Sequence, residues 1–286
     1  MKKVVASVLA FGSLVAAGSA FAGLPAATGV VGSLHDMTRV VPGTADAMGR
    51  VCVYCHAPHH SLVTDGTSLQ GALPLWNHQL STANFTPYTW ATPDNQAAVG
   101  SITDPLVGPS RLCMSCHDGN VAIDEHGVAS NSTWKQAGGT FMSSVEGGRA
   151  NLSADLSNTH PIGFDYNAMA NARNKAVVSG QGTNGSEAGQ EIVTSNNHYA
   201  DSITISTDLN GAYNTVSRNQ GNKTIADNLY GGNIMTCATC HEVHNKENAV
   251  QDAFNGNNGS STTTKPNYFL YAKENNSLIC LSCHIK

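Results

Sequence analysis

Cys52-Val53-Tyr54-Cys55-His56 is the first of four pentapeptides with one pattern, and together they use every cysteine of the 286-residue chain. The others are Cys113-Met114-Ser115-Cys116-His117, Cys237-Ala238-Thr239-Cys240-His241 and Cys280-Leu281-Ser282-Cys283-His284. A Cys-x-x-Cys-His pattern is the attachment signature of c-type haem. Two thiols on a short helical turn reach two vinyl groups on one porphyrin edge, and the following imidazole binds the iron. The pattern predicts four covalently bound haem c groups, eight cysteine tethers and the proximal ligands His56, His117, His241 and His284.

Cysteine pairs of this spacing also occur in zinc sites, redox-active dithiols and disulfides. The histidines favour haem over these alternatives. The chain has only 12 His, so the chance that a His follows all four pairs at random is on the order of a few in a million.

Residues 1–22 have the pattern of a cleaved secretory signal peptide. Lys2 and Lys3 precede an apolar run that starts at Val4, and Ala20-Phe21-Ala22 matches an A-x-A cleavage site. A membrane anchor is the alternative, but the run is short and no other stretch is long and apolar enough to cross a bilayer. We therefore expect export without a membrane anchor, to the cell surface or the extracellular space, with the periplasm as the alternative location.

The composition is polar but weakly charged. Charged residues make up 12% of the chain, and removal of two lysines and no acid takes the formal net charge from −5 to −7. An acidic chain without a basic stripe argues against a nucleic-acid partner. With 41% apolar and 6% aromatic residues, the side chains alone predict a thin core, which four haem groups would complete.

The spacing of the motifs divides the chain into two halves. Motifs one and two start 61 residues apart, and motifs three and four start 43 apart. We therefore expect a first di-haem unit at 23–130 and a second at 234–286. The predicted fold class is a mostly irregular multihaem cytochrome, with short α-helices around a tetrahaem core.

The intervening residues 131–233 contain no cysteine and have the composition of a linker and an insertion. From about residue 171 this segment is rich in Asn, Gly, Ser and Thr. Ile203 and Ile205 alternate with polar residues, and Asn210-Gly211 follows as a turn signal. The alternation predicts a small β-rich insertion, and disorder is the alternative.

Each haem iron also needs a second axial ligand or an open face. Eight His remain beyond the proximal four, so ligation by two His is expected at every iron. His59 and His244 each lie three residues after a proximal His, on the same side of a helical turn, so the ring can reach a neighbouring haem but not its own. The five distal candidates are His35, His59, His78, His160 and His244. Five candidates for four places leave one surplus ring, or one that binds a haem of another copy.

The remaining rings, of His60, His126 and His198, are assigned to solvent. Each distal candidate could instead be an ordinary surface or core histidine, because a lone His needs no metal partner.

The strings CVYCHAPHH, PLWNH, LCMSCHDG, SNTHPIGFDY, CATCHEVHN and LCLSCH together resemble the multihaem c-type cytochromes of metal-reducing bacteria. Within these, the chain is similar to the tetrahaem outer-membrane cytochrome E type, whose members polymerise into extracellular filaments. The resemblance covers about residues 32–170 and 234–286. It implies haem groups with two His ligands in a continuous line. It also implies, as partners, other copies in a head-to-tail filament, other multihaem cytochromes and extracellular metal oxides.

The motifs and the resemblance together predict an electron-transfer protein rather than an enzyme. No motif is altered in the manner of C-x-x-C-K to mark a catalytic haem, so no catalytic residue is assigned. A soluble periplasmic tetrahaem shuttle is the first alternative. A multihaem reductase of nitrogen or sulfur oxyanions is the second.

Overall fold

The structure is a computed structural model, and it describes residues 30–31, 35–41, 46, 48–59, 61–62, 75–89, 102–127, 138–145, 148–178, 192–195, 224–244, 269–270 and 278–284. The expected signal peptide at 1–22 and the hairpin signal near 203–211 lie outside these residues. Within them, no helix has both the length and the apolar character needed to cross a membrane.

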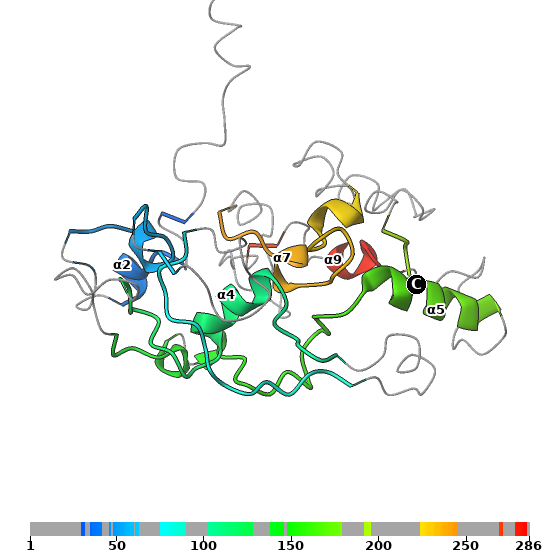
Figure 1. Cartoon of the computed structure of the whole chain (residues 1–286), viewed down its shortest axis with the longest axis horizontal. Coiled ribbons are helices and arrows are strands. Elements are labelled where there is room, and N and C mark those ends of the chain that lie inside the picture. Colours follow the sequence, from blue (N-terminus) through cyan, green and yellow to red (C-terminus); the bar gives the residue numbers. More distant parts are fainter. Residues whose placement is uncertain are drawn as a thin grey trace, which may run out of the picture.

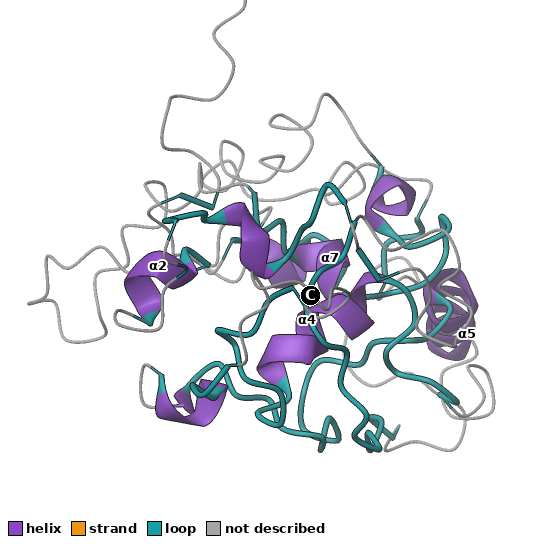
Figure 2. Cartoon of the chain, turned by 60° about the vertical axis from the view of Figure 1, so that its left-hand side comes forward, coloured by secondary structure: helices purple, strands orange, loops and turns teal. Residues whose placement is uncertain are grey.

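The described part of the chain is irregular backbone with short helices (Figure 2). In chain order the helices are α2 (Met37–Val40), η1 (Cys52–Tyr54), α4 (Pro109–His117), η2 (Met142–Ser144), α5 (Tyr166–Val178), η4 (Ile225–Asn228), α7 (Cys237–Cys240) and α9 (Leu278–Leu281). Segments distant in sequence are joined by isolated β-bridges, such as His56 with Trp76 and His241 with Leu270. Within the described residues, none of these bridges extends into a β-strand.

Motifs two and three lie next to each other in the middle of the molecule, between α2 and α5 (Figure 1). Helix α4 packs on α7, and the N–H of Cys237 donates to Ser110 Oγ at 3.0 Å. The 163–164 segment also pairs with Met235, because Gly163 N–H donates to Met235 O at 2.8 Å. The contacts of α4 with α7 join the two expected di-haem units directly, and the contact at Gly163 joins the intervening segment to the second unit.

Helix α5 was not predicted from the sequence. It crosses residue 171, where the polar insertion was expected to begin. Asp165 Oδ1 accepts the N–H of Ala168 at 2.8 Å, which satisfies a donor of the first turn. Alanine recurs along the segment, and alanine has the highest helix propensity. An acidic cap followed by alanines was the signal that could have located this helix.

Apolar side chains gather in three separate clusters within the described residues. The largest joins α5, η4 and the segment before α7 through Phe164, Ala170, Val193, Ile225, Leu229 and Met235. The second is formed by Val41, Ile123 and Met142, and the third by Leu106, Met114 and Leu156. Motif two contributes Cys116 and Met114 to the second and third clusters, and motif four, with the preceding Ile279, contributes Cys283 to the first.

Helix α4 begins at a backbone conformation that only glycine adopts easily. Gly108 has a φ of +62°, and Pro109 follows in the first helical position. Proline suits that position because its missing N–H would have no helical partner. The Tyr230 ring packs so closely that a Cβ on Gly108 would lie 2.7 Å from Tyr230 Cγ. Both the conformation and the space therefore require glycine.

Gly108→Ala is expected to lower the free energy of unfolding by about 2 kcal/mol or more, because backbone strain and overpacking add. Gly232→Ala is the matched control. Gly232 also has a positive φ, of +81°, but nothing lies within 4 Å of the added Cβ. The control should lose only the backbone contribution, of about 1 kcal/mol. Denaturant unfolding followed by circular dichroism measures both, and equal losses would contradict the role of Tyr230.

Candidate functional site

Each Cys-x-x-Cys-His motif forms a helical turn. In three motifs the His N–H donates to the carbonyl of the first cysteine, at 2.9 Å for His56, 3.0 Å for His241 and 2.9 Å for His284. The remaining motif, 113–117, is the last part of α4. The turn places two thiols and one imidazole close together, which is the donor set needed to tether and ligate one haem.

All eight cysteines are free thiols, and the second cysteine of every motif is half-buried. Burial raises the pKa of Cys55, Cys116 and Cys240 to about 12 and that of Cys283 to about 11. A redox-active dithiol needs a thiolate with a lowered pKa. None of these four cysteines has a lowered pKa, whereas a hydrogen bond from Cys113 lowers the pKa of Cys237, the first cysteine of motif three. The thiol pKa values therefore do not decide between haem and the dithiol alternative.

Two distal candidates face the proximal imidazole of another motif. The ring centroids of His244 and His56 are 6.2 Å apart with an interplanar angle of 22°. Those of His35 and His117 are 6.0 Å apart at 66°. With about 2 Å from metal to nitrogen and about 1 Å from nitrogen to centroid, two imidazoles on opposite sides of one metal ion have centroids about 6 Å apart. Both pairs have this separation.

The His35–His117 pair is half-buried and uncharged at neutral pH. Burial, with smaller effects of His117 and His241, lowers the pKa of His35 to about 4. Burial also lowers the pKa of His117. The Nδ1 of His117 lies 2.8 Å from Ala150 O, so Nδ1 carries the proton and Nε2 keeps its lone pair. Neutral imidazole with a free Nε2 is the form that binds a metal.

The ring of His244 is exposed and is held by a carboxylate. Its Nδ1 lies 2.8 Å from Glu242 Oε1, and its main-chain N–H donates to the same oxygen at 3.0 Å. The hydrogen bond that His244 donates to the Glu242 carboxylate raises the pKa of His244 above its ordinary value. As in His117, the partner of Nδ1 leaves Nε2 available for a metal.

The other three distal candidates lie in different surroundings. His78 is buried, with Nδ1 2.9 Å from Glu125 O and Nε2 3.3 Å from Cys116 Sγ, so it faces a tether rather than a proximal ring. His59 and His160 are exposed. For these two, no contact with a proximal ring is found among the described residues, and their role as ligands stays a prediction. His60 and His198 lie outside the described residues.

Asn77 connects the first motif to a distant loop. Its N–H donates to Cys55 O at 2.9 Å, and its side-chain amide donates to Val53 O at 2.5 Å. In turn, its Oδ1 accepts the N–H of Gly127 at 3.1 Å. The side chain is fully buried, so these bonds are shielded from water. The PLWNH stretch therefore fixes the first motif against residues 125–127.

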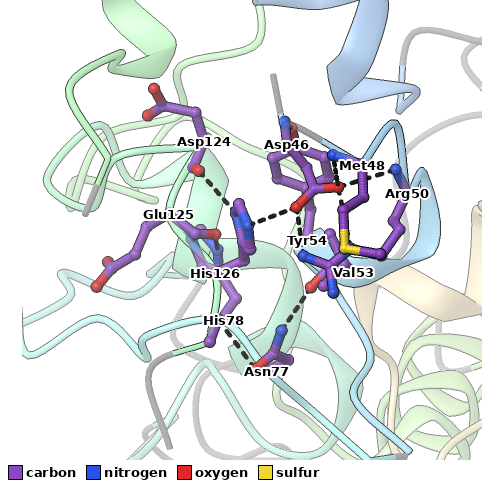
Figure 3. A network of polar contacts seen from close by, with 11 residues as sticks. Asp46, Met48, Arg50, Val53, Tyr54, Asn77, His78, Asp124, Glu125 and His126 are labelled. Carbon is purple, nitrogen blue, oxygen red and sulfur yellow. Dashed lines mark hydrogen bonds and ion pairs between the residues drawn. The ribbon is translucent and has the colours of Figure 1, made fainter. Parts of the chain in front are cut away.

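His126 corrects the sequence assignment, because it is buried at 1% exposure rather than in solvent. It belongs to a polar network in which Nε2 lies 3.4 Å from Asp46 Oδ1 and Nδ1 lies 3.2 Å from Asp124 O (Figure 3). Asp46 also pairs with Arg50, and its N–H donates to Tyr54 Oη at 2.6 Å. The network holds Tyr54 inside the first motif. Residue spacing did not predict it, because the segments 46–54 and 124–126 that meet in it are far apart in the sequence.

The surroundings of the first motif fit a bound group that carries hydrogen-bond acceptors. The indole N–H of Trp76 is buried and has no hydrogen-bond partner among the residues that the structure describes. Its ring stands perpendicular to that of His56, with centroids 6.2 Å apart. Buried donors are almost always paired, and the carboxylate groups of haem are suitable acceptors.

Neither the known protein-family models nor the curated proteins give a match to this chain. Within the described residues, no cluster of three or more His, Cys, Asp or Glu side chains could hold a bare metal ion.

Asp46→Asn is expected to remove a pH-dependent part of the stability. Hydrogen bonds from the Arg50 side chain hold the pKa of Asp46 well below its ordinary value of 3.8. A carboxyl with a lowered folded-state pKa stabilises the fold above the unfolded value and loses this contribution as pH falls toward the folded value. The stability difference between wild type and variant should therefore be largest at neutral pH and narrow below about pH 4.

Urea unfolding at pH 7 and pH 3 measures this difference. Arg50→Gln is the matched variant, because it removes the cause of the shift and leaves the carboxyl in place. It should also weaken the pH dependence. A difference between wild type and Asp46→Asn that is the same at both pH values would contradict the assignment.

Proposed function

We propose that this chain is a tetrahaem c-type cytochrome that carries electrons over long distances outside the cell, as the subunit of a head-to-tail filament. The observation that carries the proposal is the pairing of proximal histidines with second imidazoles at 6.2 and 6.0 Å, next to Cys-x-x-Cys turns. The filament part rests on the resemblance of the motif strings to filament-forming tetrahaem cytochromes.

The residues have separate roles in this proposal. The eight cysteines tether the haem groups covalently, and His56, His117, His241 and His284 are the proximal ligands. His244 and His35 are the second ligands at motifs one and two. Haem supplies a one-electron ferric–ferrous couple. Two imidazoles per iron leave no position for a substrate, which favours electron transfer over catalysis and places the potentials below those of His/Met sites.

Contacts between tethers support the passage of electrons from one site to the next. The Cys113 thiol hydrogen-bonds to Cys237, which lowers the pKa of Cys237. Burial is the largest cause of the raised pKa of Cys240, and the electrostatic effect of the neighbouring Cys283 is the second. Motif three therefore adjoins motif two on one side and motif four on the other. Sites with so little protein between them suit electron hopping without a diffusing carrier.

His244→Ala and His35→Ala should each leave one of the four irons with a single protein ligand. Each variant should therefore show one high-spin haem among four, by absorption and electron paramagnetic resonance spectra, at an unchanged ratio of four haems per chain. His198→Ala is the control, because the sequence assigns that ring to solvent, and it should stay fully low-spin. Fully low-spin spectra in both test variants would overturn the ligand assignment.

Assembly is tested separately, by electron microscopy and haem-stained gels of material sheared from cells. Uniform filaments whose haem-stained band is this chain are expected. Haem-positive monomers confined to the periplasm would instead support the soluble shuttle. Binding of carbon monoxide or nitrite to the wild-type protein would support an oxyanion reductase.

A further inference from the structure

The hydrogen bond between Glu242 and His244 has a role that the proposed function leaves unassigned. Glu242 Oε1 accepts from both Nδ1 and the main-chain N–H of His244, at 2.8 and 3.0 Å. Two bonds to one oxygen fix the ring relative to its own backbone. Because Nδ1 is the donor, Nε2 is the nitrogen left for a metal.

Glu242 is itself anchored to the fold. Its main-chain N–H donates to Phe269 O at 2.9 Å, and the neighbouring His241 forms a β-bridge with Leu270. Residues 269–270, which lie outside the motif, therefore hold the backbone that carries the Glu242 carboxylate. It holds the ring of His244 at 6.2 Å from His56.

The charge of this partner distinguishes His244 from His78, His117 and His160. The Nδ1 atoms of His78, His117 and His160 lie 2.9, 2.8 and 3.0 Å from the main-chain carbonyls of Glu125, Ala150 and Pro161. A carbonyl orients a ring, whereas a carboxylate also draws the Nδ1 proton toward itself and makes the imidazole a stronger electron donor. A stronger donor stabilises ferric over ferrous iron.

We propose that Glu242 is a positioning residue that orients His244 toward His56 and lowers the reduction potential of the site at motif one relative to the site at motif two. The inference rests on the proposed function, because it takes His244 as an iron ligand. His244 is exposed and Glu242 is half-buried, with side-chain exposures of 62% and 36%, and ion pairs this open to solvent contribute little to folding stability. The hydrogen bond therefore acts on the ligand and not on the fold.

The test is a spectroelectrochemical titration of the tetrahaem protein carrying Glu242→Gln, which keeps an acceptor oxygen but removes its charge. One of the four sites should become about tenfold easier to reduce, a shift of about +59 mV, while all four stay low-spin. Asp155→Asn is the charge-matched control, because Asp155 is exposed and bonds to Ser157. It should leave the four potentials unchanged.

A double variant assigns the shift to motif one. When His244→Ala is already present, adding Glu242→Gln should produce no further shift, because the ring through which it acts is gone. Unchanged potentials in Glu242→Gln, or an equal shift of all four sites, would overturn the inference while four low-spin haems leave the proposed function intact. Absence of haem from the wild-type chain would instead remove the proposed function itself.

Discussion

The main-chain hydrogen bond from a motif histidine to the carbonyl of its first cysteine is the constraint on which the candidate sites depend. It closes a turn with only two residues between the thiols, so the two tethers and the ring cannot separate. A turn of this size cannot bury much apolar surface by itself. Three copies are therefore fixed from outside, by Asn77 at motif one, by Ser110 at motif three and by the N–H of Val193 at Cys283 O of motif four, whereas motif two is the end of the longer helix α4. The irregular backbone between the helices brings these partner residues into contact with the motifs.

Motif three has the central position among the four. Its α7 helix packs on α4, its first thiol contacts Cys113, and its trailing histidine faces His56 of motif one. The segment 241–244 is held in turn by the main chain at 269–270. A group of small apolar clusters would not by itself define the relative positions of the motifs. Direct polar contacts between motifs fix their relative positions.

Local patterns were sufficient to locate the turns, because a five-residue motif carries its own geometry. Spacing also identified His244 as a ring that reaches another motif, since three residues beyond a proximal His it lies on the same side of a turn. The choice of His56 as its partner depends on how distant segments pack, and no local pattern contains that information. His126 shows the same limit, because its burial depends on Asp46 and Tyr54, both far away in the sequence. Helix α5 was missed for a different reason, since a polar, Asn-rich composition obscured a capping residue and an alanine-rich segment.

The pairing of His244 with His56 has a consequence for the order of maturation. If the chain is exported from its N-terminus, as the proposed function requires, motif one would emerge first and residue 244 much later. On the proposed ligand set, the earliest haem to be attached remains without its second axial ligand until the third motif has emerged and docked. The bonds of Asn77 to Val53, Cys55 and Gly127 can form sooner, and would keep the half-finished site folded in the interval. The first site to be started is thus among the last to be completed, and a chain truncated before residue 244 would carry an open, reactive iron at motif one.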